Sequence, residues 1–165
     1  MMSAKRKSKM QDKKSIYICG PLTELPEERQ RPIREFYEQL ADIAEKVTGK
    51  RAFVPHEHYD PIQHASYTPR EVDAGERKQV CENTSLLLVV AIAPSWGGGI
   101  EVEMANQNHI PVIILCEQEK LEHRKISRLL RGNPAVMQVI FYTSENDALS
   151  KLEQALKAYI PKVYA

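Results

Sequence analysis

The feature that most constrains this chain is the alternation of short apolar runs with longer segments of helical periodicity. Two of the runs, "SLLLVVAIA" and "IPVIILC", contain almost no polar residue. A strand that faces water on one side alternates polar and apolar residues, whereas a strand of a parallel sheet is buried on both faces and is continuously apolar. The sequence therefore predicts a parallel sheet with helices packed on both of its faces.

Five strands and the helices between them account for the sequence from residue 15 onward. The predicted strands are "SIYICG", "RAFVP", "SLLLVVAIA", "IPVIILC" and "AVMQVIFY". The predicted helices are "PEERQRPIREFYEQLADIAEKVTG", "REVDAGERKQVCENT", a helix from about Ile100 to Asn108, a helix around "EHRKISRLLRG", and the amphipathic "ENDALSKLEQALKAYI". We predict an α/β fold in which residues 15–165 form a single domain with a doubly wound, Rossmann-like or flavodoxin-like sheet of five parallel strands.

Composition and charge exclude several classes of protein. Hydrophobic residues make up 42% and charged residues 27% of the chain, which is typical of a soluble globular protein. No apolar run reaches the roughly 18 residues that a membrane-spanning helix needs, so we expect no membrane partner. The cysteines, Cys19, Cys81 and Cys116, have no metal-ligand spacing and are expected to be reduced thiols of a cytoplasmic protein.

Residues 1–14 carry six Lys or Arg and one Asp, which gives this segment a strong positive charge. Short basic segments without interleaved aromatic residues are usually solvated, so we predict a disordered tail and expect no nucleic-acid partner. Histidines and acidic residues also gather in the loop "HEHYDPIQHASYTP". No cysteine or second cluster completes a tetrahedral set there, so we expect neither a metal nor a cofactor.

Two predicted strands end in glycine-bearing turns, "YICGPLT" and "APSWGGGIE". Ligands of doubly wound sheets bind beyond the carboxyl ends of the strands. Glycine lets the backbone approach a ligand closely, and the N-terminus of a following helix offers free N–H groups to an anion. These turns suit a phosphate or a carboxylate, although neither matches the dinucleotide-binding or the P-loop motif.

Two carboxylates follow the second of these turns. With a helix that begins near Ile100, Glu101 lies in the first turn and Glu103 points to a different side. A glutamate in a first turn commonly just complements the helix dipole. The glycines, however, leave Glu101 facing open backbone, where a carboxylate can attack an electrophilic sugar carbon as a nucleophile.

Four segments of the chain resemble one known family. These are "IYICGPL", "LLLVVAIAPSWGGGIEVEMA", "IPVIIL" and "SRLLRG". They are similar to the nucleoside 2-deoxyribosyltransferases and the related 2'-deoxynucleoside 5'-phosphate N-hydrolases, and the second segment resembles their S-x-G-x-G-x-E-x-x-x-A signature. The resemblance implies an enzyme that acts on the N-glycosidic bond of a small nucleoside or nucleotide.

The resemblance also implies roles for individual residues. Glu101 matches the catalytic nucleophile, and Tyr17 matches the tyrosine whose hydroxyl orients it. Together with the position of the predicted cleft, the resemblance leads us to expect that substrate is bound by Gly20, Pro21, His58, Ser95, Gly97, Gly99 and Ser127. Ser95 and Gly97 match positions that hold a 5'-phosphate, whereas the transferase branch tends to have an acidic residue where Ser95 stands. Ser127 matches a serine that reaches the phosphate from a neighbouring subunit, which implies a homo-oligomer with shared active sites.

The chain departs from the family pattern at the carboxylate that assists the leaving base. The corresponding position holds Arg77, with Glu76 beside it. Asp73 lies one helical turn earlier on the same face, and we nominate it as the replacement. For the base pocket, His58 or Tyr59 is the candidate, because their loop leaves the second predicted strand towards the cleft.

The sequence leaves two classes of function open. In the first, the protein is an N-glycosidase that cleaves the base–sugar bond of a (deoxy)nucleoside 5'-monophosphate through a covalent glycosyl intermediate on Glu101. A second base in place of water as acceptor would make the same enzyme a nucleoside 2-deoxyribosyltransferase. In the second class, the protein is a nucleotide-binding module without catalysis, whose basic tail contacts nucleic acid.

Overall fold

The computed structural model describes residues 14–164 of the chain, with side chains as far as residue 160. The predicted basic tail therefore lies, except for Lys14, outside the described residues. The strands are β1 (Ser15–Cys19), β2 (Thr84–Val90), β3 (Val112–Glu117) and β4 (Val136–Tyr142). The helices are α2 (Glu27–Thr48), α3 (His56–Tyr59), α4 (Pro69–Asn83), α5 (Trp96–Gln107), α6 (Gln118–Glu122), α7 (Arg128–Arg131) and α8 (Glu145–Tyr164).

The four strands form one parallel sheet in the spatial order β1-β2-β3-β4. The α/β class is confirmed, but the prediction of five strands is not, because "RAFVP" contributes an isolated bridge between Phe53 and Tyr17. The bridge consists of two backbone hydrogen bonds, from Ile18 N–H to the Phe53 carbonyl at 2.9 Å and from Phe53 N–H to the Ile16 carbonyl at 2.8 Å. Pairing stops there because Pro55 has no N–H to donate and leads directly into α3.

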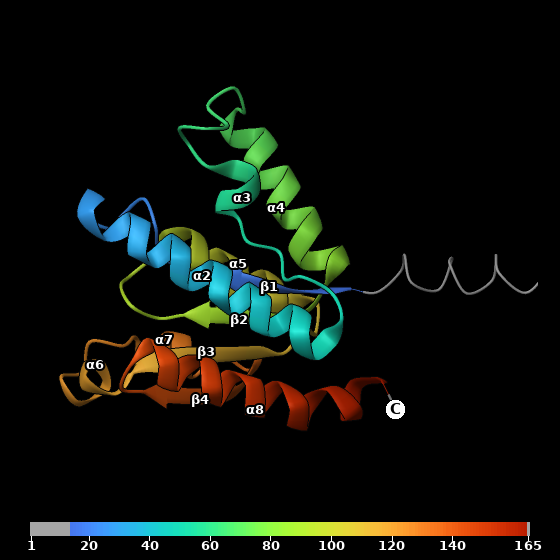
Figure 1. Ribbon diagram of the computed structural model, residues 1–165. Helices are drawn as coiled ribbons and strands as arrows, with labels where there is room; N and C mark the ends of the chain where they lie inside the picture. Colours follow the sequence, from blue (N-terminus) through green and yellow to red (C-terminus); the bar gives the residue numbers. More distant parts are fainter. Residues whose placement is uncertain (1–13, 165) are drawn as a thin grey trace, which may run out of the picture.

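Helices cover both faces of the sheet (Figure 1). On one face, α2 and α8 contact each other, and on the other α4 contacts α5. The alternation of side chains along β1 connects it to both layers: Ile16 and Ile18 join the core with α2 and α8, whereas Tyr17 and Cys19 join the core with α4 and α5. Tyr17 and Cys19 of β1 are thus directed towards the layer that contains α5.

The order of the strands reverses at β1. After β1 the chain passes through α2 to the bridge at Phe53 on one side, and it then passes through α4 to β2 on the other side. Such a reversal opens a crevice beyond the carboxyl ends of β1 and β2, where α/β proteins bind ligands. In Figure 1 the arrowheads of β2 and β4 point to the end of the sheet where α2 begins and where α6 lies.

Helix α5 begins four residues earlier than the sequence predicted, at Trp96 instead of Ile100. Ser95 is the N-cap residue, and its hydroxyl accepts a hydrogen bond from Gly98 N–H at 3.2 Å. The three glycines are therefore helical residues of the first turn, not a turn before the helix. Glycine is a poor helix former, so the sequence alone placed the start after them, whereas the serine cap overrides this preference.

The segment "EHRKISRLLRG" also differs from its prediction as a single helix. It is divided between the end of α6 and the short helix α7. Arg124 has the left-handed φ of 54° that ends α6, and the Ser127 hydroxyl caps α7 by accepting a hydrogen bond from Leu130 N–H at 3.2 Å. No helix among the described residues is long and apolar enough to cross a membrane.

Candidate active site

Glu101 and Tyr17 form a buried hydrogen bond where β1 faces α5. The Tyr17 hydroxyl donates to Oε1 of Glu101. Tyr17 is fully buried and only 7% of the Glu101 residue is exposed. The pairing predicted for these two residues is thus present in the structure. Because α5 begins at Trp96, Glu101 lies in the second turn of the helix and not in the first. The alternative role for Glu101, to complement the helix dipole from the first turn, therefore does not apply.

Burial and hydrogen bonding act in opposite directions on the Glu101 carboxylate. Burial raises the pKa of Glu101 above its ordinary value, and hydrogen bonds from the Cys19 thiol and the Tyr17 hydroxyl offset part of this rise by stabilising the charged form. The pKa of Tyr17 is itself raised well above its usual value by burial and by the neighbouring Glu101 charge. Tyr17 therefore stays protonated and remains a donor to the carboxylate.

The first turn of α5 separates two cavities. The smaller, which we call the aromatic cavity, has a volume of about 410 Å³ and is lined by Glu101, Gly97, Tyr59, His64, Tyr67, Asp73 and Glu76, among others. The larger, which we call the large cavity, has a volume of about 1160 Å³ and is lined by Gly20, Pro21, Glu24, Ser95, Gly99, Ser127 and a group of basic residues, among others. Of the two phosphate candidates, Gly97 thus lines the same cavity as Glu101, whereas Ser95 lines the other cavity.

The three glycines of α5 have different surroundings. A Cβ atom on Gly98 would lie 3.1 Å from the Cys19 sulfur, so this glycine allows α5 to pack closely against the end of β1. No heavy atom would lie within 4 Å of a Cβ on Gly97 or Gly99. Gly97 lines the aromatic cavity and Gly99 lines the large cavity, so each leaves open space beside the helix N-terminus.

The Ser95 hydroxyl lies in the large cavity at the N-terminus of α5. Besides accepting from Gly98, it contacts Oε1 of Glu24 at 3.4 Å, and this carboxylate comes from the loop after β1. Glu24 is exposed and also accepts a hydrogen bond from Leu22 N–H at 3.2 Å. A carboxylate thus contacts the serine that the resemblance assigns to a 5'-phosphate.

Glu76 is a site residue that the sequence did not single out. It lines the aromatic cavity together with Glu101 and Asp73. Its own burial, with the neighbouring charges of Glu101 and Asp73, raises the pKa of Glu76 to about 7. Asp73, the residue nominated from the sequence, also lines this cavity, but its side chain is 56% exposed and pairs with Arg77 at 3.0 Å.

The aromatic residues of the loop before α4 lie at different depths. His58 stacks on Phe53 at 4.3 Å between ring centroids, and Phe53 stacks on Tyr17 at 5.2 Å, so His58 supports the site from behind. Tyr59 and Tyr67 line the aromatic cavity itself and contact each other edge to face. Of the two residues proposed for a base pocket, Tyr59 lines this cavity.

The remaining predicted residues lie in the large cavity. Gly20, Pro21 and Ser127 line it with Ser95 of the same chain. A Cβ atom on Gly20 would lie 3.2 Å from the Val90 carbonyl oxygen and would collide with the Tyr37 hydroxyl, which donates to the Pro21 carbonyl at 2.6 Å. Among the described residues, no three His, Cys, Asp or Glu side chains are placed to hold a metal ion.

Comparisons with known proteins add a structural likeness. No family model and no curated protein matches the chain. The CMP N-glycosidase BcmB of Clostridium botulinum superposes with a TM-score of 0.61 at 17% identity, over 85% of this chain and 98% of that one. BlsM superposes with a TM-score of 0.63 at 18% identity, over 93% of this chain and 96% of that one. A conserved protein from Enterococcus faecalis V583 gives 0.57 at 18%, over 87% and 99%. These similarities show a shared α/β fold.

The raised pKa of Glu76 predicts a pH dependence of stability. Between its ordinary pKa of 4.5 and its folded value of about 7, Glu76 holds a proton in the folded protein that the unfolded chain has released. The Glu76 contribution to the free energy of unfolding therefore decreases as the pH rises through this interval. Urea unfolding of Glu76→Gln should show the variant gaining stability relative to the unaltered protein between about pH 5 and about pH 8. The exposed Asp73→Asn variant should show a smaller change, and parallel pH profiles for Glu76→Gln and the unaltered protein would contradict the assignment.

Proposed function

We propose that the protein is an N-glycosidase that cleaves the base–sugar bond of a (deoxy)nucleoside 5'-monophosphate. The observation that carries this proposal is a buried carboxylate, Glu101, which accepts a hydrogen bond from Tyr17 and lines a cavity that also holds Glu76. Two carboxyl groups in different environments are the chemical requirement of glycosidic hydrolysis. The fold shared with a CMP N-glycosidase adds support.

The two carboxyl groups take complementary roles in the proposed reaction. An oxygen of ionised Glu101 attacks C1', the bond between C1' and the base nitrogen breaks, and protonated Glu76 gives its proton to the leaving base. In the second step the Glu76 carboxylate takes a proton from water, whose oxygen bonds to C1' and releases Glu101. The products are the free base and a sugar phosphate. A second base in place of water would give the transferase reaction.

We assign the proton donor to Glu76 in place of Asp73. A general acid must hold a proton near neutral pH, and the pKa of Glu76, raised by burial to about 7, meets this requirement. The Asp73 carboxylate, by contrast, is paired with Arg77 and is more than half exposed. The aromatic cavity, lined by Tyr59 and Tyr67, is the proposed pocket for the base.

The nucleophile assignment predicts a sharp contrast between two glutamates of α5. Glu101→Gln should reduce the release of free base by several orders of magnitude, because the covalent step is lost. Glu103→Gln is the matched control, since the Glu103 carboxylate bonds to the side-chain amides of Asn106, Gln107 and Asn133. Chromatography of base released from a panel of nucleoside monophosphates measures both variants. Equal losses would place the nucleophile elsewhere, and no release from any nucleotide by the unaltered protein would favour a binding module.

The acid assignment predicts the alkaline side of the pH profile. As the pH rises above about 7, Glu76 loses its proton, so kcat/KM of the unaltered protein should fall. Glu76→Gln should lower the rate by about 10²–10⁴-fold and remove this alkaline fall. Asp73→Asn should keep the fall in place. An alkaline limb that persists in Glu76→Gln and disappears in Asp73→Asn would return the role to Asp73.

The 5'-phosphate should act as a binding handle at Ser95 and the first-turn amides of α5. We therefore expect monophosphates to exceed the corresponding nucleosides in kcat/KM. Ser95→Asp should reduce this preference, because a second carboxylate beside Glu24 repels the phosphate. Steady-state kinetics with one nucleotide and its nucleoside, and Ser95→Thr as the control that keeps the hydroxyl, measures the effect. A preference of the unaltered protein for nucleosides would favour the transferase reading.

We further propose that the active protein is a homo-oligomer. Three apolar side chains near the cavities are exposed on the single chain: Trp96 at 90%, Ile100 at 55% and Leu129 at 88%. A two-fold interface would cover such residues on both chains and exclude water from both sites. Ser127 and Leu129 both line the large cavity. Ser127 is the residue that we expect to reach the site of the neighbouring chain across this interface.

Shared sites predict complementation between two inactive variants. A mixture of Glu101→Ala and Ser127→Ala proteins should recover part of the activity that each lacks alone, because mixed oligomers contain one site with both residues intact. Trp96→Ser should abolish this recovery if the indole lies in the interface. Light scattering at micromolar concentration gives the oligomeric state. A monomer with full activity would contradict the proposal.

A further inference from the structure

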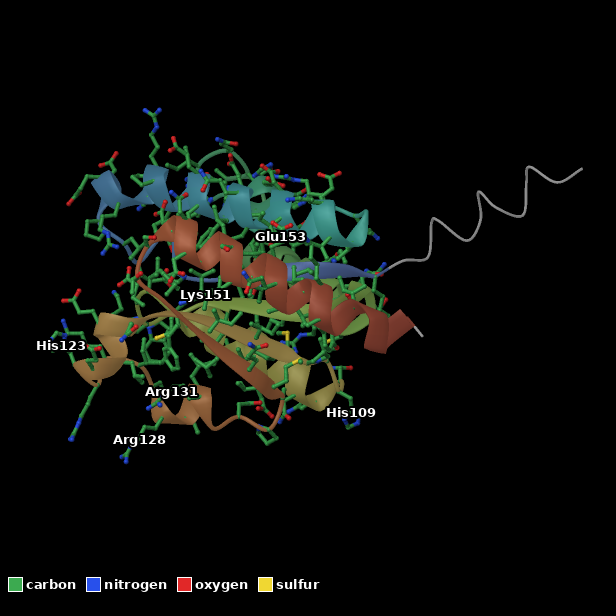
Figure 2. The ribbon with its side chains drawn as sticks, turned by 60° about the horizontal axis from the view of Figure 1, so that its bottom comes forward. His109, His123, Arg128, Arg131, Lys151 and Glu153 are labelled. Carbon is green, nitrogen blue, oxygen red and sulfur yellow. The ribbon has the colours of Figure 1, made fainter. Side chains whose placement is uncertain are left out.

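The large cavity carries more positive charge than one phosphate requires. Five basic residues line it: Arg29, Lys120, Arg124, Lys125 and Arg128, which we call the cationic rim. They come from separate parts of the chain, namely the start of α2 and the segment from α6 to α7. In Figure 1 both parts lie at the carboxyl end of the sheet, and Figure 2 shows the Arg128 side chain extending outward from α7.

Most of the cationic rim has no partner among the residues that the structure describes. Lys120 is the exception: its ammonium donates to the Ile92 carbonyl and lies 3.6 Å from a Glu117 carboxylate oxygen. The other four form neither an ion pair nor a side-chain hydrogen bond in residues 14–160. Unpaired cations that converge on one cavity favour a ligand with several negative charges.

The two acidic residues of the cavity do not neutralise the rim. The Glu103 carboxylate accepts hydrogen bonds from side-chain amides, at 3.1 Å from Asn133. Glu24 contacts Ser95 and the backbone of its own loop. Neither carboxylate forms an ion pair with a rim residue in the described part of the chain. The positive charge of the rim therefore remains available to a ligand.

One rim residue is held by a costly backbone conformation. Arg124 has a φ of 54° at the end of α6, a position where glycine is the usual residue. The hydrogen bond from Lys125 N–H to the Lys120 carbonyl, at 2.8 Å, closes the helix end around it. The fold thus keeps an arginine in a conformation that disfavours side chains, and it directs that arginine towards the cavity margin.

We propose that the large cavity binds the phosphate chain of a nucleoside 5'-di- or triphosphate. Its first phosphate lies at Ser95 and the N-terminus of α5, and the following phosphates lie on the cationic rim. The cavity, at about 1160 Å³, is large enough for such a chain. This inference rests on the proposed function for the position of the first phosphate, and it extends the substrate class beyond monophosphates.

Calorimetric titration tests the inference by measuring binding without turnover. The protein is the Glu101→Gln variant, and the probes are cytidine 5'-mono-, di- and triphosphate without added metal. Each added phosphate should tighten binding by about 3–10-fold. The increase is modest because each ion pair between a phosphate and a basic side chain of the rim is exposed to solvent and contributes little binding free energy. The double variant Arg124→Gln/Arg128→Gln should bring the ratio of mono- to triphosphate Kd towards one.

A matched control separates the rim from general charge. The double variant Arg70→Gln/Lys78→Gln lowers the net charge equally at exposed positions of α4, outside the large cavity, and should keep the Kd ratio. Equal Kd values for the three nucleotides, or equal losses in both double variants, would overturn the inference. Tighter binding of an oligodeoxycytidylate than of the triphosphate would also overturn it, in favour of a nucleic-acid strand. If binding tightens with each added phosphate but the unaltered protein releases no base, the proposed function fails and this inference stands.

Discussion

The hydrogen bond between Tyr17 and Glu101 is the interaction on which the site depends. It joins the first strand to the second turn of α5, and both partners are buried. A carboxylate in such surroundings is costly unless donors stabilise it, and here a hydroxyl and the Cys19 thiol do so. Gly98 favours the close packing that brings these donors to Glu101, because a Cβ atom there would lie 3.1 Å from the Cys19 sulfur. The packing of Gly98 of α5 against Cys19 of β1 thus helps to hold Glu101 next to its two hydrogen-bond donors.

The same burial gives the two carboxyl groups of the aromatic cavity different tasks. Glu101 has two donors that favour its ionised form, whereas Glu76 has no such donor in the described part of the chain and is surrounded by other acids. Like charges in a confined space resist being ionised together, so the group with fewer hydrogen-bond donors keeps the proton. Because both residues are glutamates, it is the surroundings of each carboxyl group that make Glu101 the candidate nucleophile and Glu76 the candidate proton donor.

Much of this arrangement could be predicted from the sequence. Continuous apolar runs indicated a parallel sheet, and the glycine-bearing strand ends indicated where a ligand cleft lies. Two local features were missed. The glycines of α5 are helical because the Ser95 cap outweighs their intrinsic preference, and "RAFVP" pairs at Phe53 alone because Pro55 has no N–H to continue the pairing. The end of α6 could not be predicted, because the residue with a left-handed backbone conformation there is Arg124 and arginine rarely adopts that conformation. Glu76 could not be distinguished from its neighbour Asp73, because helical spacing does not report burial.

The central claim is that Glu101 becomes covalently bonded to the sugar. The most direct measurement is mass spectrometry of the protein after rapid acid quenching during turnover of a 2'-fluoro nucleoside 5'-monophosphate, a substrate whose second step is slowed. The account predicts a mass increase equal to the fluorinated sugar phosphate less one water, located by peptide mapping on the segment that contains Glu101 and missing in Glu101→Gln. Release of base without any adduct, or an adduct on another residue, would contradict it.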